Sequence, residues 1–280
     1  MEVRLHDSVD DFRVIAEPLY RRDPIAHTLE LTMLGGDSFG DDPLLLTIWG
    51  DGKPLGAALQ TPPYPLVCNG IPAAAMGVVV PFLVERRPEL SGVRGVRPTA
   101  VDFATAWQAT TGRAAVVDTE ERLYRLATLQ VPEGVLGSDR LATAEDRDLL
   151  VDWVSQFFGE AFSGVRNDGG AEFVDSADRR GNRFTVWTVD DVPVSMAMLR
   201  APAFGVSRIG PVFTPIACRG HGYGSAVTAA ASRLAHRSGT ADVVLFADLA
   251  NPVSNAIYQR IGFEGVADSV RIDFSPRVDV

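Results

Sequence analysis

A glycine-rich turn between a strand-like run and a helix-like run restricts the fold of this chain more than any other feature. The run Ser207–Pro215 is rich in Val, Ile and Phe, and it leads into Arg219-Gly-His-Gly-Tyr-Gly-Ser225. Beyond the turn, apolar residues recur at helical spacing until Gly239. The first turn of a helix has unpaired N–H groups and a partial positive charge, and glycines let a phosphate approach that backbone closely. The turn therefore predicts a phosphate site, to which Arg219 would add charge-assisted hydrogen bonds.

The glycine spacing disfavours two familiar phosphate ligands. A dinucleotide fingerprint needs a third glycine, but its place is taken by Ser225 when counted from Gly220 and by Val227 when counted from Gly222. Asp242 lies about the right distance onward, but it starts an apolar run, whereas the ribose-binding acid belongs at the end of a strand. A P-loop is excluded because no Gly-Lys-Ser/Thr follows the turn. A nicotinamide-dependent oxidoreductase is therefore disfavoured.

A second strand and helix follow the first pair. The run Asp242–Ala250 meets Asn251-Pro252, which is an N-cap followed by proline at the first helical position, and the helix is expected to run to Ile261 and stop at Gly262. At about 100° per residue, one side of this helix is expected to pack and the other to be polar. The packing side holds Val253, Ala256, Ile257 and Ile261, and the polar side holds Asn251, Ser254, Asn255 and Tyr258.

These two linked elements resemble the GNAT superfamily of acyl-CoA-dependent N-acetyltransferases. Arg219-x-x-Gly222-x-Gly224 is similar to the R/Q-x-x-G-x-G/A acyl-CoA signature of that superfamily. The second element resembles its strand followed by N-x-x-(S/A)-x-x-x-Y-x-x-x-G-F, with matches at Asn251, Ser254, Tyr258, Gly262 and Phe263. The resemblance implies an α+β fold with a mixed sheet flanked by helices, and acetyl-CoA as the acyl donor.

The resemblance also implies roles for individual residues. The strand before the turn would give backbone groups to the pantetheine arm and to the oxyanion, and the acyl thioester would lie where this strand and Asp242–Ala250 splay apart. Tyr258 would protonate the departing thiolate, although its ring could instead simply pack under the cofactor. Asn251 would contact the pantetheine or capture a strand carbonyl, a role that competes with its use as an N-cap. The cofactor-binding residues expected in this way are Val212, Phe213, Thr214, Arg219, Gly220, His221, Gly222, Tyr223, Gly224, Ser225, Asn251 and Ser254.

The general base and the acceptor cannot be assigned from the sequence. His221 is expected beside the phosphates, where it contributes a donor rather than removing a proton from the amine. The resemblance places the acceptor against the loops of Gly159–Arg183, which are rich in Gly, Asp and Asn. Carboxylates that could act as a base are Glu160, Asp168, Glu172, Asp175, Asp178 and Asp248, and each is more often a solvated surface group.

Charge and cysteine usage narrow the partners. The net charge of −10 argues against nucleic acid or an anionic membrane and mildly favours an amine-bearing acceptor. The amino terminus lacks a secretory signal, so a cytoplasmic location is expected. Cys68 and Cys218 lie far apart without His spacing typical of zinc, so we expect two reduced cysteines and no metal.

The chain repeats itself once. Hairpins with a tryptophan and a proline recur around Trp49–Pro63 and Trp187–Pro202. The helix predicted at Ala100–Gly112 parallels Ala226–Gly239, and this alignment sets Gly92–Pro98 opposite the glycine-rich turn without its glycines. We therefore expect two tandem GNAT-like domains, a degenerate one at 1–133 and an N-acetyltransferase domain at 138–280, joined by a Gly- and Pro-containing linker.

The second half is expected to contain a helix near 144–158, a loop-rich segment up to Gly181, and then strands at 183–189, 193–202 and 207–215. The function expected from these features is acyl-CoA-dependent N-acyl transfer, most simply from acetyl-CoA to a primary amine, with one CoA bound per chain. The alternative is a non-catalytic acyl-CoA-binding or interaction module, because a degenerate copy indicates that chemistry can be lost.

Overall fold

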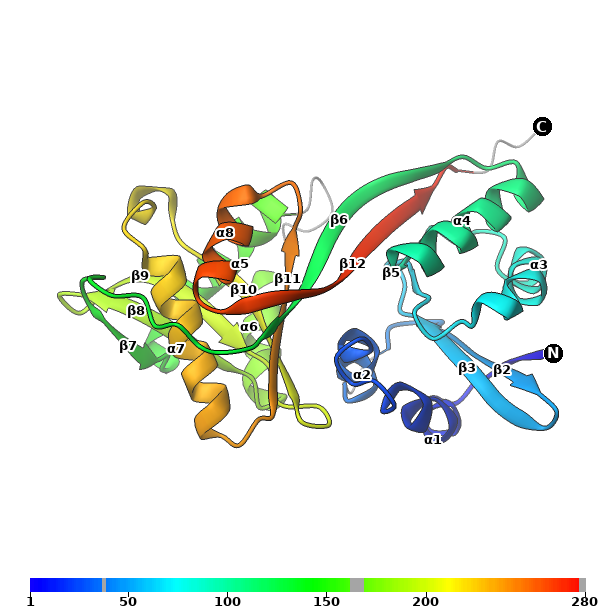
Figure 1. Ribbon diagram of the computed structural model, residues 1–280, viewed down its shortest axis with the longest axis horizontal. Coiled ribbons are helices and arrows are strands. Elements are labelled where there is room, and N and C mark those ends of the chain that lie inside the picture. Colours follow the sequence, from blue (N-terminus) through cyan, green and yellow to red (C-terminus); the bar gives the residue numbers. More distant parts are fainter. Residues whose placement is uncertain (37–38, 162–168, 277–280) are drawn as a thin grey trace. The chain divides into compact units, whose positions relative to one another are not determined.

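The computed structural model describes residues 1–36, 39–161 and 169–276. The chain forms two compact units (Figure 1). The amino-terminal unit comprises Met1–Leu123, Asp248–Ala250 and Val266–Val280, and the carboxy-terminal unit comprises Tyr124–Ala247 and Asn251–Gly265. Two long strands, β6 (Ala115–Leu126) and β12 (Phe263–Phe274), contribute residues to both units.

In the amino-terminal unit, the strands follow the order β1-β2-β3-β4-β5-β12, and only the β4–β5 pair is parallel. Its elements are β1 (Glu2–Leu5), α1 (Val9–Tyr20), α2 (Thr28–Leu34), β2 (Leu44–Gly50), β3 (Lys53–Gln60), β4 (Leu66–Val67), η1 (Ala73–Ala75), α3 (Met76–Arg86), β5 (Gly92–Val96) and α4 (Arg97–Thr111).

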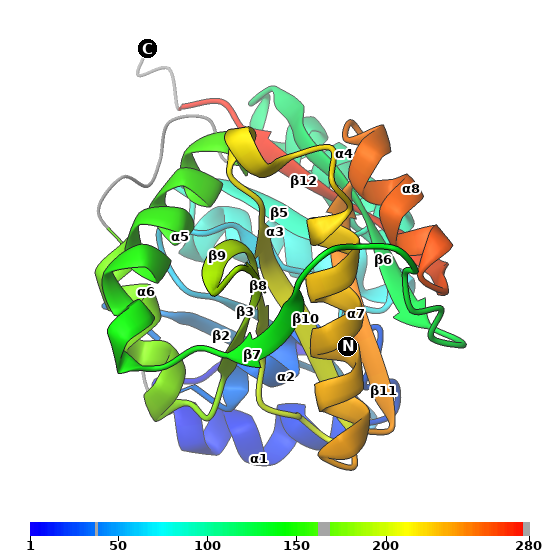
Figure 2. The ribbon, with the colours of Figure 1, turned by 90° about the vertical axis from the view of Figure 1, so that its left-hand side faces the viewer.

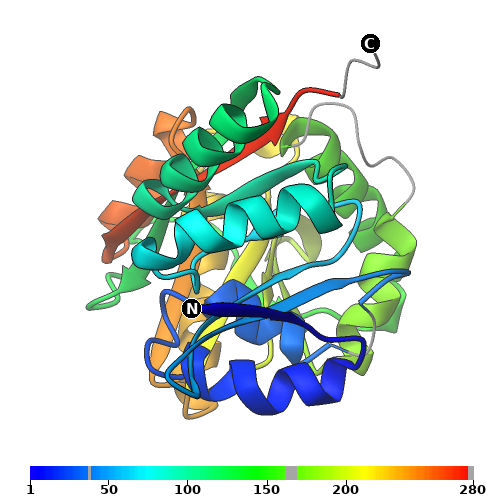
Figure 3. The same cartoon turned by 90° about the vertical axis from the view of Figure 1, so that its right-hand side faces the viewer.

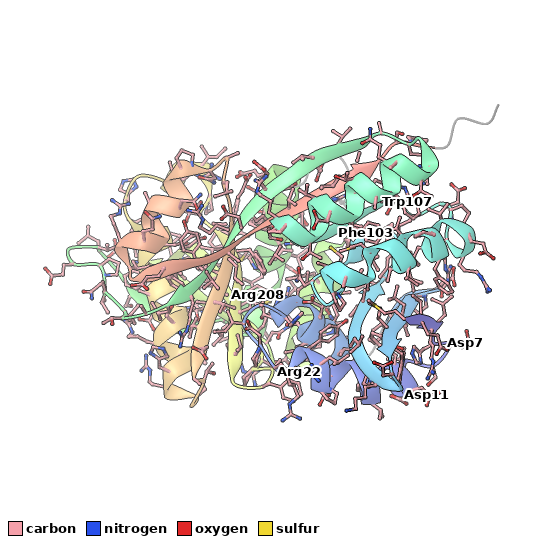
Figure 4. The ribbon with its side chains drawn as sticks, turned by 45° about the vertical axis from the view of Figure 1, so that its right-hand side comes forward. Asp7, Asp11, Arg22, Phe103, Trp107 and Arg208 are labelled. Carbon is pink, nitrogen blue, oxygen red and sulfur yellow. The ribbon has the colours of Figure 1, made fainter. Side chains whose placement is uncertain are left out.

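Helices cover both faces of these strands. Helices α3 and α4 pack on one face, while α1 packs on β2 and β3 and also contacts α2 (Figure 3). The core beneath α3 and α4 includes Val270, Ile272 and Phe274 from the end of β12. The ring of Phe274 stacks on that of Trp107 with centroids 5.1 Å apart. Phe103 extends the stack, and it lies with Trp107 on α4 (Figure 4). The last strand of the chain therefore completes the core of the amino-terminal unit.

In the carboxy-terminal unit, the strands follow the order β6-β11-β10-β9-β8-β7, and the β10–β11 pair is parallel. Its further elements are β7 (Ser138–Leu141), η2 (Ala144–Asp146), α5 (Arg147–Ala161), α6 (Gly170–Arg179), β8 (Arg183–Val189), β9 (Val192–Leu199), β10 (Val206–Phe213), η3 (Ile216–Cys218), α7 (Tyr223–Arg237), β11 (Asp242–Asp248) and α8 (Pro252–Arg260).

Alternation along the strands divides the core of this unit into two layers. Ala197 and Leu199 lie in the layer under α7, whereas Met196 and Met198 lie in the layer with α5 and α6. Figure 2 shows these helices around the strands of the unit. Successive strand residues point to opposite faces, so one strand serves both layers. The α+β prediction, with mixed sheets and flanking helices, is confirmed.

The two units repeat the same element order. Elements β1, α1, α2, β2, β3, β4, α3, β5, α4 and β6 correspond in sequence to β7, α5, α6, β8, β9, β10, α7, β11, α8 and β12. The predicted pair of hairpins agrees with this order, because β2–β3 and β8–β9 both turn through two positive-φ residues and both shift register at the tryptophan.

The alignment of the helices predicted from sequence is wrong. The counterpart of α7 is α3, so the helix at Ala100–Gly112 corresponds to α8 instead. The counterpart of the glycine-rich turn is therefore the connection between β4 and α3, and Gly92–Pro98 is the end of β5 leading directly into α4. The predicted alignment pairs the two helices by the glycine that follows each of them. Such a glycine does not show which helices of the two units correspond.

Other sequence predictions differ in detail. The segment before Gly181, expected to be loop-rich, contains the helix α6. The predicted ranges 1–133 and 138–280 remain a prediction about independent domains, and the compact units divide the chain differently because 248–250 and 266–280 belong with the amino-terminal residues. Among the described residues, no helix combines the length and apolar character needed to cross a membrane.

Candidate functional site

Strands β10 and β11 stop pairing in the region where we expect, from the sequence, the acyl thioester to lie. Their parallel pairing runs from Val206 opposite Asp242 to Ile209 opposite Leu245 and goes no further. On its other edge β10 continues to pair with β9, with Val212 opposite Ala197 and Phe213 opposite Met196. Within the described chain, the backbone of β10 beyond Ile209 therefore has an edge toward β11 that no strand occupies.

A register shift lies at this point of β10. The shift falls between Ile209 and Val212. Ile209 belongs to the core layer under α7, and Phe213, four residues on, belongs to the layer with α5, although residues four apart on a regular strand share a face. The bulge therefore turns Val212 toward the layer that contains Tyr258. Ser195 holds the end of the strand, because its hydroxyl donates to the Phe213 carbonyl at 3.0 Å and lies 2.8 Å from the Thr214 hydroxyl.

The glycine-rich turn forms the start of α7 as predicted. Gly222 is the N-cap, with φ of 81°, and Gly220 has φ of 84°, a conformation that favours glycine. A side chain at Gly222 would also meet Val135, since an added Cβ would lie 3.1 Å from its Cγ2. The first helical hydrogen bond runs from the Ala226 N–H to the Gly222 carbonyl.

Three backbone amides are consequently left without acceptors. Gly222 has no side chain to cap the helix, and the N–H groups of Tyr223, Gly224 and Ser225 have no hydrogen-bond partner in the part of the chain that the structure describes. Such amides, together with the positive end of the helix dipole, form an anion-binding site.

The guanidinium of Arg219 forms hydrogen bonds with Thr214 and Glu160. Its Nε donates to the Thr214 carbonyl at 2.9 Å, and its Nη2 donates to both carboxylate oxygens of Glu160 at 2.7 and 2.8 Å. These contacts connect the turn with the end of β10 and with α5. A direct bond from Arg219 to a phosphate remains a prediction.

Aromatic rings lie beside the amides. The rings of His221 and Tyr223 stack with centroids 5.4 Å apart and planes 13° from parallel. His221 is exposed, and its Nδ1 lies 3.4 Å from the Cys218 carbonyl. Cys218 is half-buried and has a free thiol.

Helix α8 begins as predicted and packs Ile257 and Ile261 as predicted, but the rest of its buried face differs. The Asn251 side chain accepts the N–H of Ser254 at 3.1 Å, as an N-cap does. Val253 is 67% exposed and Ala256 is also exposed, whereas Tyr258 is 9% exposed. The assignment of Val253 and Ala256 to the packing face is therefore wrong, because the large ring of Tyr258 takes up the contact with the core.

Tyr258 lies among aromatic rings. Its centroid is 6.4 Å from that of Tyr124 and 6.1 Å from that of Phe263, all within the core layer under α7. Burial raises the pKa of the Tyr258 phenol to about 12. The phenol therefore stays protonated at neutral pH and can act as a proton donor but not as a base.

Sequence reasoning missed the structural roles of three contributors to this site, of which it named only Glu160, as a candidate base. Tyr124 donates its hydroxyl to Asn255 at 2.8 Å and packs beside Tyr258. Ser195 and Glu160 hold the end of β10 and the guanidinium of the turn. All three are distant from the motifs in sequence, and no local pattern distinguishes them.

The candidate bases are dispersed, and none is brought to the site as an evident base. Glu160 pairs with Arg219, Asp175 is held by two bonds from Arg147, and Asp178 pairs with Arg183. Glu172 lies in the first turn of α6, and Asp248 accepts the N–H of Ala250 at 2.7 Å. Asp168 lies outside the described residues. In residues 1–36, 39–161 and 169–276, no group of three or more His, Cys, Asp or Glu side chains is placed to hold a metal ion.

Comparisons with known proteins agree with this geometry. Residues 148–263 match the model of the acetyltransferase (GNAT) family. None of the curated proteins matches the sequence. Among solved structures, an acetyltransferase from the GNAT family of Colwellia psychrerythraea is 11% identical, with a TM-score of 0.65, and the match covers 98% of this chain and 100% of that one.

Two further structures are similar over almost the full length. A GCN5-related N-acetyltransferase from Sphaerobacter thermophilus is 16% identical, with a TM-score of 0.64 over 100% of this chain and 97% of that one. A tandem GNAT protein from the clavulanic acid biosynthesis pathway is 14% identical, with a TM-score of 0.59 over 99% of this chain and 100% of that one. The chain thus has the fold of a tandem GNAT protein, and within its carboxy-terminal half residues 148–263 match the GNAT acetyltransferase family.

Proposed function

We propose that this protein is an N-acetyltransferase that moves the acetyl group of acetyl-CoA to a primary amine. The observation that carries the proposal is the set of three unpartnered amides at Tyr223, Gly224 and Ser225, which follow a strand whose edge toward β11 is free. Together these features fit a ligand with a pyrophosphate at one end and an extended arm at the other.

The residues of the turn fit a pyrophosphate for a further reason. A side chain at Gly222 would be strained by its positive φ and would meet Val135, so the turn keeps a glycine at the position that precedes the three amides. Arg219, His221 and Tyr223 surround the amides with donors and rings. Acetyl-CoA, when bound, supplies an activated acyl group.

The protein's own residues would then divide the chemistry. A backbone N–H of Val212–Thr214 stabilises the charge that develops on the acyl oxygen when the amine nitrogen forms its new bond to carbon. As the carbon–sulfur bond breaks, Tyr258 gives its proton to the sulfur and regains one from the ammonium that the reaction has produced. The raised pKa of Tyr258 keeps that proton available at neutral pH.

Binding tests the first half of the proposal. Acetyl-CoA at about 100 times its Kd should stabilise the protein by roughly 2.7 kcal/mol in thermal unfolding. NADPH serves as the control, because it also carries an adenosine and a pyrophosphate but has no pantetheine arm or thioester. Equal stabilisation by NADPH, or none by acetyl-CoA, would refute the assignment of the ligand.

Turnover tests the second half. A panel of amino acids, polyamines, aminoglycosides and peptides is screened with acetyl-CoA, and free thiol is measured as the product. A thiol signal that depends on both an amine and Tyr258 supports the enzyme. Binding of acetyl-CoA without turnover on any amine would favour a non-catalytic acyl-CoA-binding module.

A further inference from the structure

The amino-terminal unit contains a cavity of its own. Its volume is about 250 Å³, and all of its lining residues belong to this unit. It is lined by the end of α1 and the connection to α2, by β3, and by the turn that follows β4. The lining residues are Leu19, Tyr20, Arg22, Asp23, His27, Leu55, Gly56, Asn69, Gly70, Ile71 and Pro72.

The cavity combines apolar walls with a few polar groups. Leu19, Leu55, Ile71 and Pro72 supply the apolar surface. Glycine is required at Gly70, because a Cβ there would lie 2.8 Å from Cε1 of Tyr20 and 2.3 Å from the Ala57 carbonyl. Small-molecule sites share this combination, and those for drug-sized ligands are roughly 300–1,000 Å³. The cavity is therefore suited to a more compact molecule.

A buried carboxylate stands behind one wall. Glu30 is fully buried, and its Oε1 lies 3.1 Å from Nδ1 of His27, which lines the cavity. The imidazole also packs against the ring of Tyr20 at 4.9 Å. A bond from Nδ1–H to the carboxylate orients the ring and leaves Nε2 as an acceptor.

Two polar atoms in this group have no partner. Neither Oε2 of Glu30 nor the hydroxyl of the fully buried Tyr20 has a hydrogen bond among the described residues. The charge of Glu30 adds to the effect of burial in raising the pKa values of Tyr20 and of Cys68. No Lys or Arg of the described chain forms an ion pair with Glu30. A buried carboxylate held by one imidazole is costly, and a cation would compensate it.

We propose that this cavity binds a compact amine with an apolar body. The ammonium donates to His27 Nε2, and its charge offsets that of Glu30. The apolar body packs on Leu19, Leu55, Ile71 and Pro72. Arg22 (Figure 4) and Asp23, both exposed, line the cavity after the end of α1. The residues of this site and those of the glycine-rich turn before α7 belong to different units.

Three probes of one shape test the chemistry in the full-length protein. Calorimetric titration uses 2-phenylethylamine, 2-phenylethanol and phenylacetate, which present an ammonium, a hydroxyl and a carboxylate on a similar body. The amine should bind at least about tenfold more tightly than the alcohol, since charge-assisted hydrogen bonds exceed neutral ones. Tighter binding of phenylacetate than of the amine would overturn the proposal. No heat with any of the three probes would also overturn it, because the cavity would then hold only water.

Substitutions locate the binding. Glu30→Gln keeps the shape and removes the charge, so the amine should lose about tenfold in affinity and most of its advantage over the alcohol. The matched control is Glu17→Gln on α1, which makes the same change in a partly exposed ion pair with Arg21 and should leave the Kd unchanged. If Glu30→Gln does not fold, Leu55→Trp at the 44% exposed wall should block the amine instead.

These variants also distinguish this site from the proposed enzyme. An amine bound as an acceptor by the carboxy-terminal unit would keep its affinity in Glu30→Gln and in Leu55→Trp. That result would overturn the proposed site and leave the acetyltransferase proposal intact. Absence of acetyl-CoA binding, in contrast, would leave the amine titration unaffected.

Discussion

The starts of α7 and α3 differ although the two helices occupy the same place in the element order. Before α7, the turn η3 ends at Cys218, and Arg219–Gly222 then leave three amides without acceptors. Before α3, the turn η1 runs directly into the helix, so the Ala75 N–H bonds to the Pro72 carbonyl and the Met76 N–H to that of Ala73. The open amides at the start of α7 therefore depend on the few residues that separate the turn η3 from the helix.

The helices α8 and α4 differ in a parallel way. The seventh residue of α8 is Tyr258, and the seventh residue of α4 is Phe103, which is buried and has no hydroxyl. The N-cap of α8 is Asn251 with a side-chain bond, whereas the N-cap of α4 is Val96 with none. At these two helices the amino-terminal unit has neither the glycine-rich turn that precedes α7 nor the hydroxyl of Tyr258, which predicts one bound CoA per chain.

The largest expected effect concerns the strand that the amino-terminal unit takes from the end of the chain. Phe274→Ala should lower the free energy of unfolding by about 3–5 kcal/mol, because it opens a cavity in the stack with Trp107 and Phe103. Urea unfolding followed by tryptophan fluorescence measures it. The control Phe204→Ala, at a 43% exposed ring, should change stability by less than about 0.5 kcal/mol. A similarly small effect of Phe274→Ala would mean that the unit folds without β12.

The second prediction removes the hydroxyl of Tyr258, so that α8 carries a phenylalanine at its seventh residue as α4 does. Tyr258→Phe should lower kcat about a hundredfold or more, roughly 2.7 kcal/mol or above, because the general acid is lost. The Kd for acetyl-CoA should stay nearly unchanged, since the ring still packs against Tyr124 and Phe263. Thiol release on an acceptor found by the amine screen measures kcat. A variant as fast as the parent would show that the phenol only packs.

A matched glycine pair tests the difference between the two helix starts. Gly224 and Gly77 are each the second residue of their helices, α7 and α3. Gly224→Glu should abolish the roughly 2.7 kcal/mol of stabilisation by acetyl-CoA at about 100 times the parent Kd, because a carboxylate enters the phosphate site. Gly77→Glu adds the same charge at an open position and should retain that stabilisation in full. Calorimetry should give one acetyl-CoA per chain.

Two results would contradict this expectation. Loss of stabilisation in Gly77→Glu would place an acyl-CoA site in the amino-terminal unit, and two equal sites by calorimetry would do the same. Undiminished stabilisation in Gly224→Glu would contradict the assignment of the glycine-rich turn as the phosphate site for acetyl-CoA.

The sequence predicted the local features of this molecule and missed those that depend on distant residues. The turn from Arg219 to Ser225, the cap at Asn251 and the α+β class follow from spacing and backbone chemistry. The hydrogen bond from Arg219 to Glu160 joins residues 59 apart, and no periodicity signals it. The same holds for Tyr124, whose place beside Tyr258 depends on how β6 runs through both units.

Two errors have identifiable physical causes. The predicted alignment pairs Gly112, which follows α4, with Gly239, which follows α7. Glycines follow many helices, so this pairing does not show that the two helices correspond. The buried face of α8 was set by counting apolar residues, which ignored the area that one aromatic ring can bury, so Tyr258 was placed on the polar side. A short strand such as β4, with Leu66 and Val67 alone, offers too little pattern to correct such an alignment.

Alkaline pH provides a smaller test of the burial of Tyr258. Its pKa is about 12 in the folded protein, above the ordinary value of 10.0, so the native state holds this proton more tightly than the unfolded state does. This contribution to stability is complete below about pH 10 and is lost as the pH rises through about 12. By about pH 11 the parent should lose roughly 1.4 kcal/mol more than Tyr258→Phe. Parallel urea unfolding at about pH 9 and pH 11 measures the difference, and equal losses would indicate an exposed phenol.

The smallest expected effect separates the two roles of Asn251. Asn251→Ala should lower the free energy of unfolding by about 1 kcal/mol through loss of the cap, whereas Asn251→Ser should lose only a few tenths because serine also caps. If the Asn251 amide also donates to the pantetheine, the serine variant should keep its stability yet bind acetyl-CoA about fivefold more weakly, which is the value of one hydrogen bond. Unfolding curves and acetyl-CoA titrations on the same preparations measure both quantities. An unchanged Kd in Asn251→Ser would restrict Asn251 to capping α8. The contrast with Val96, which caps α4 without a side-chain bond, would then concern helix stability alone.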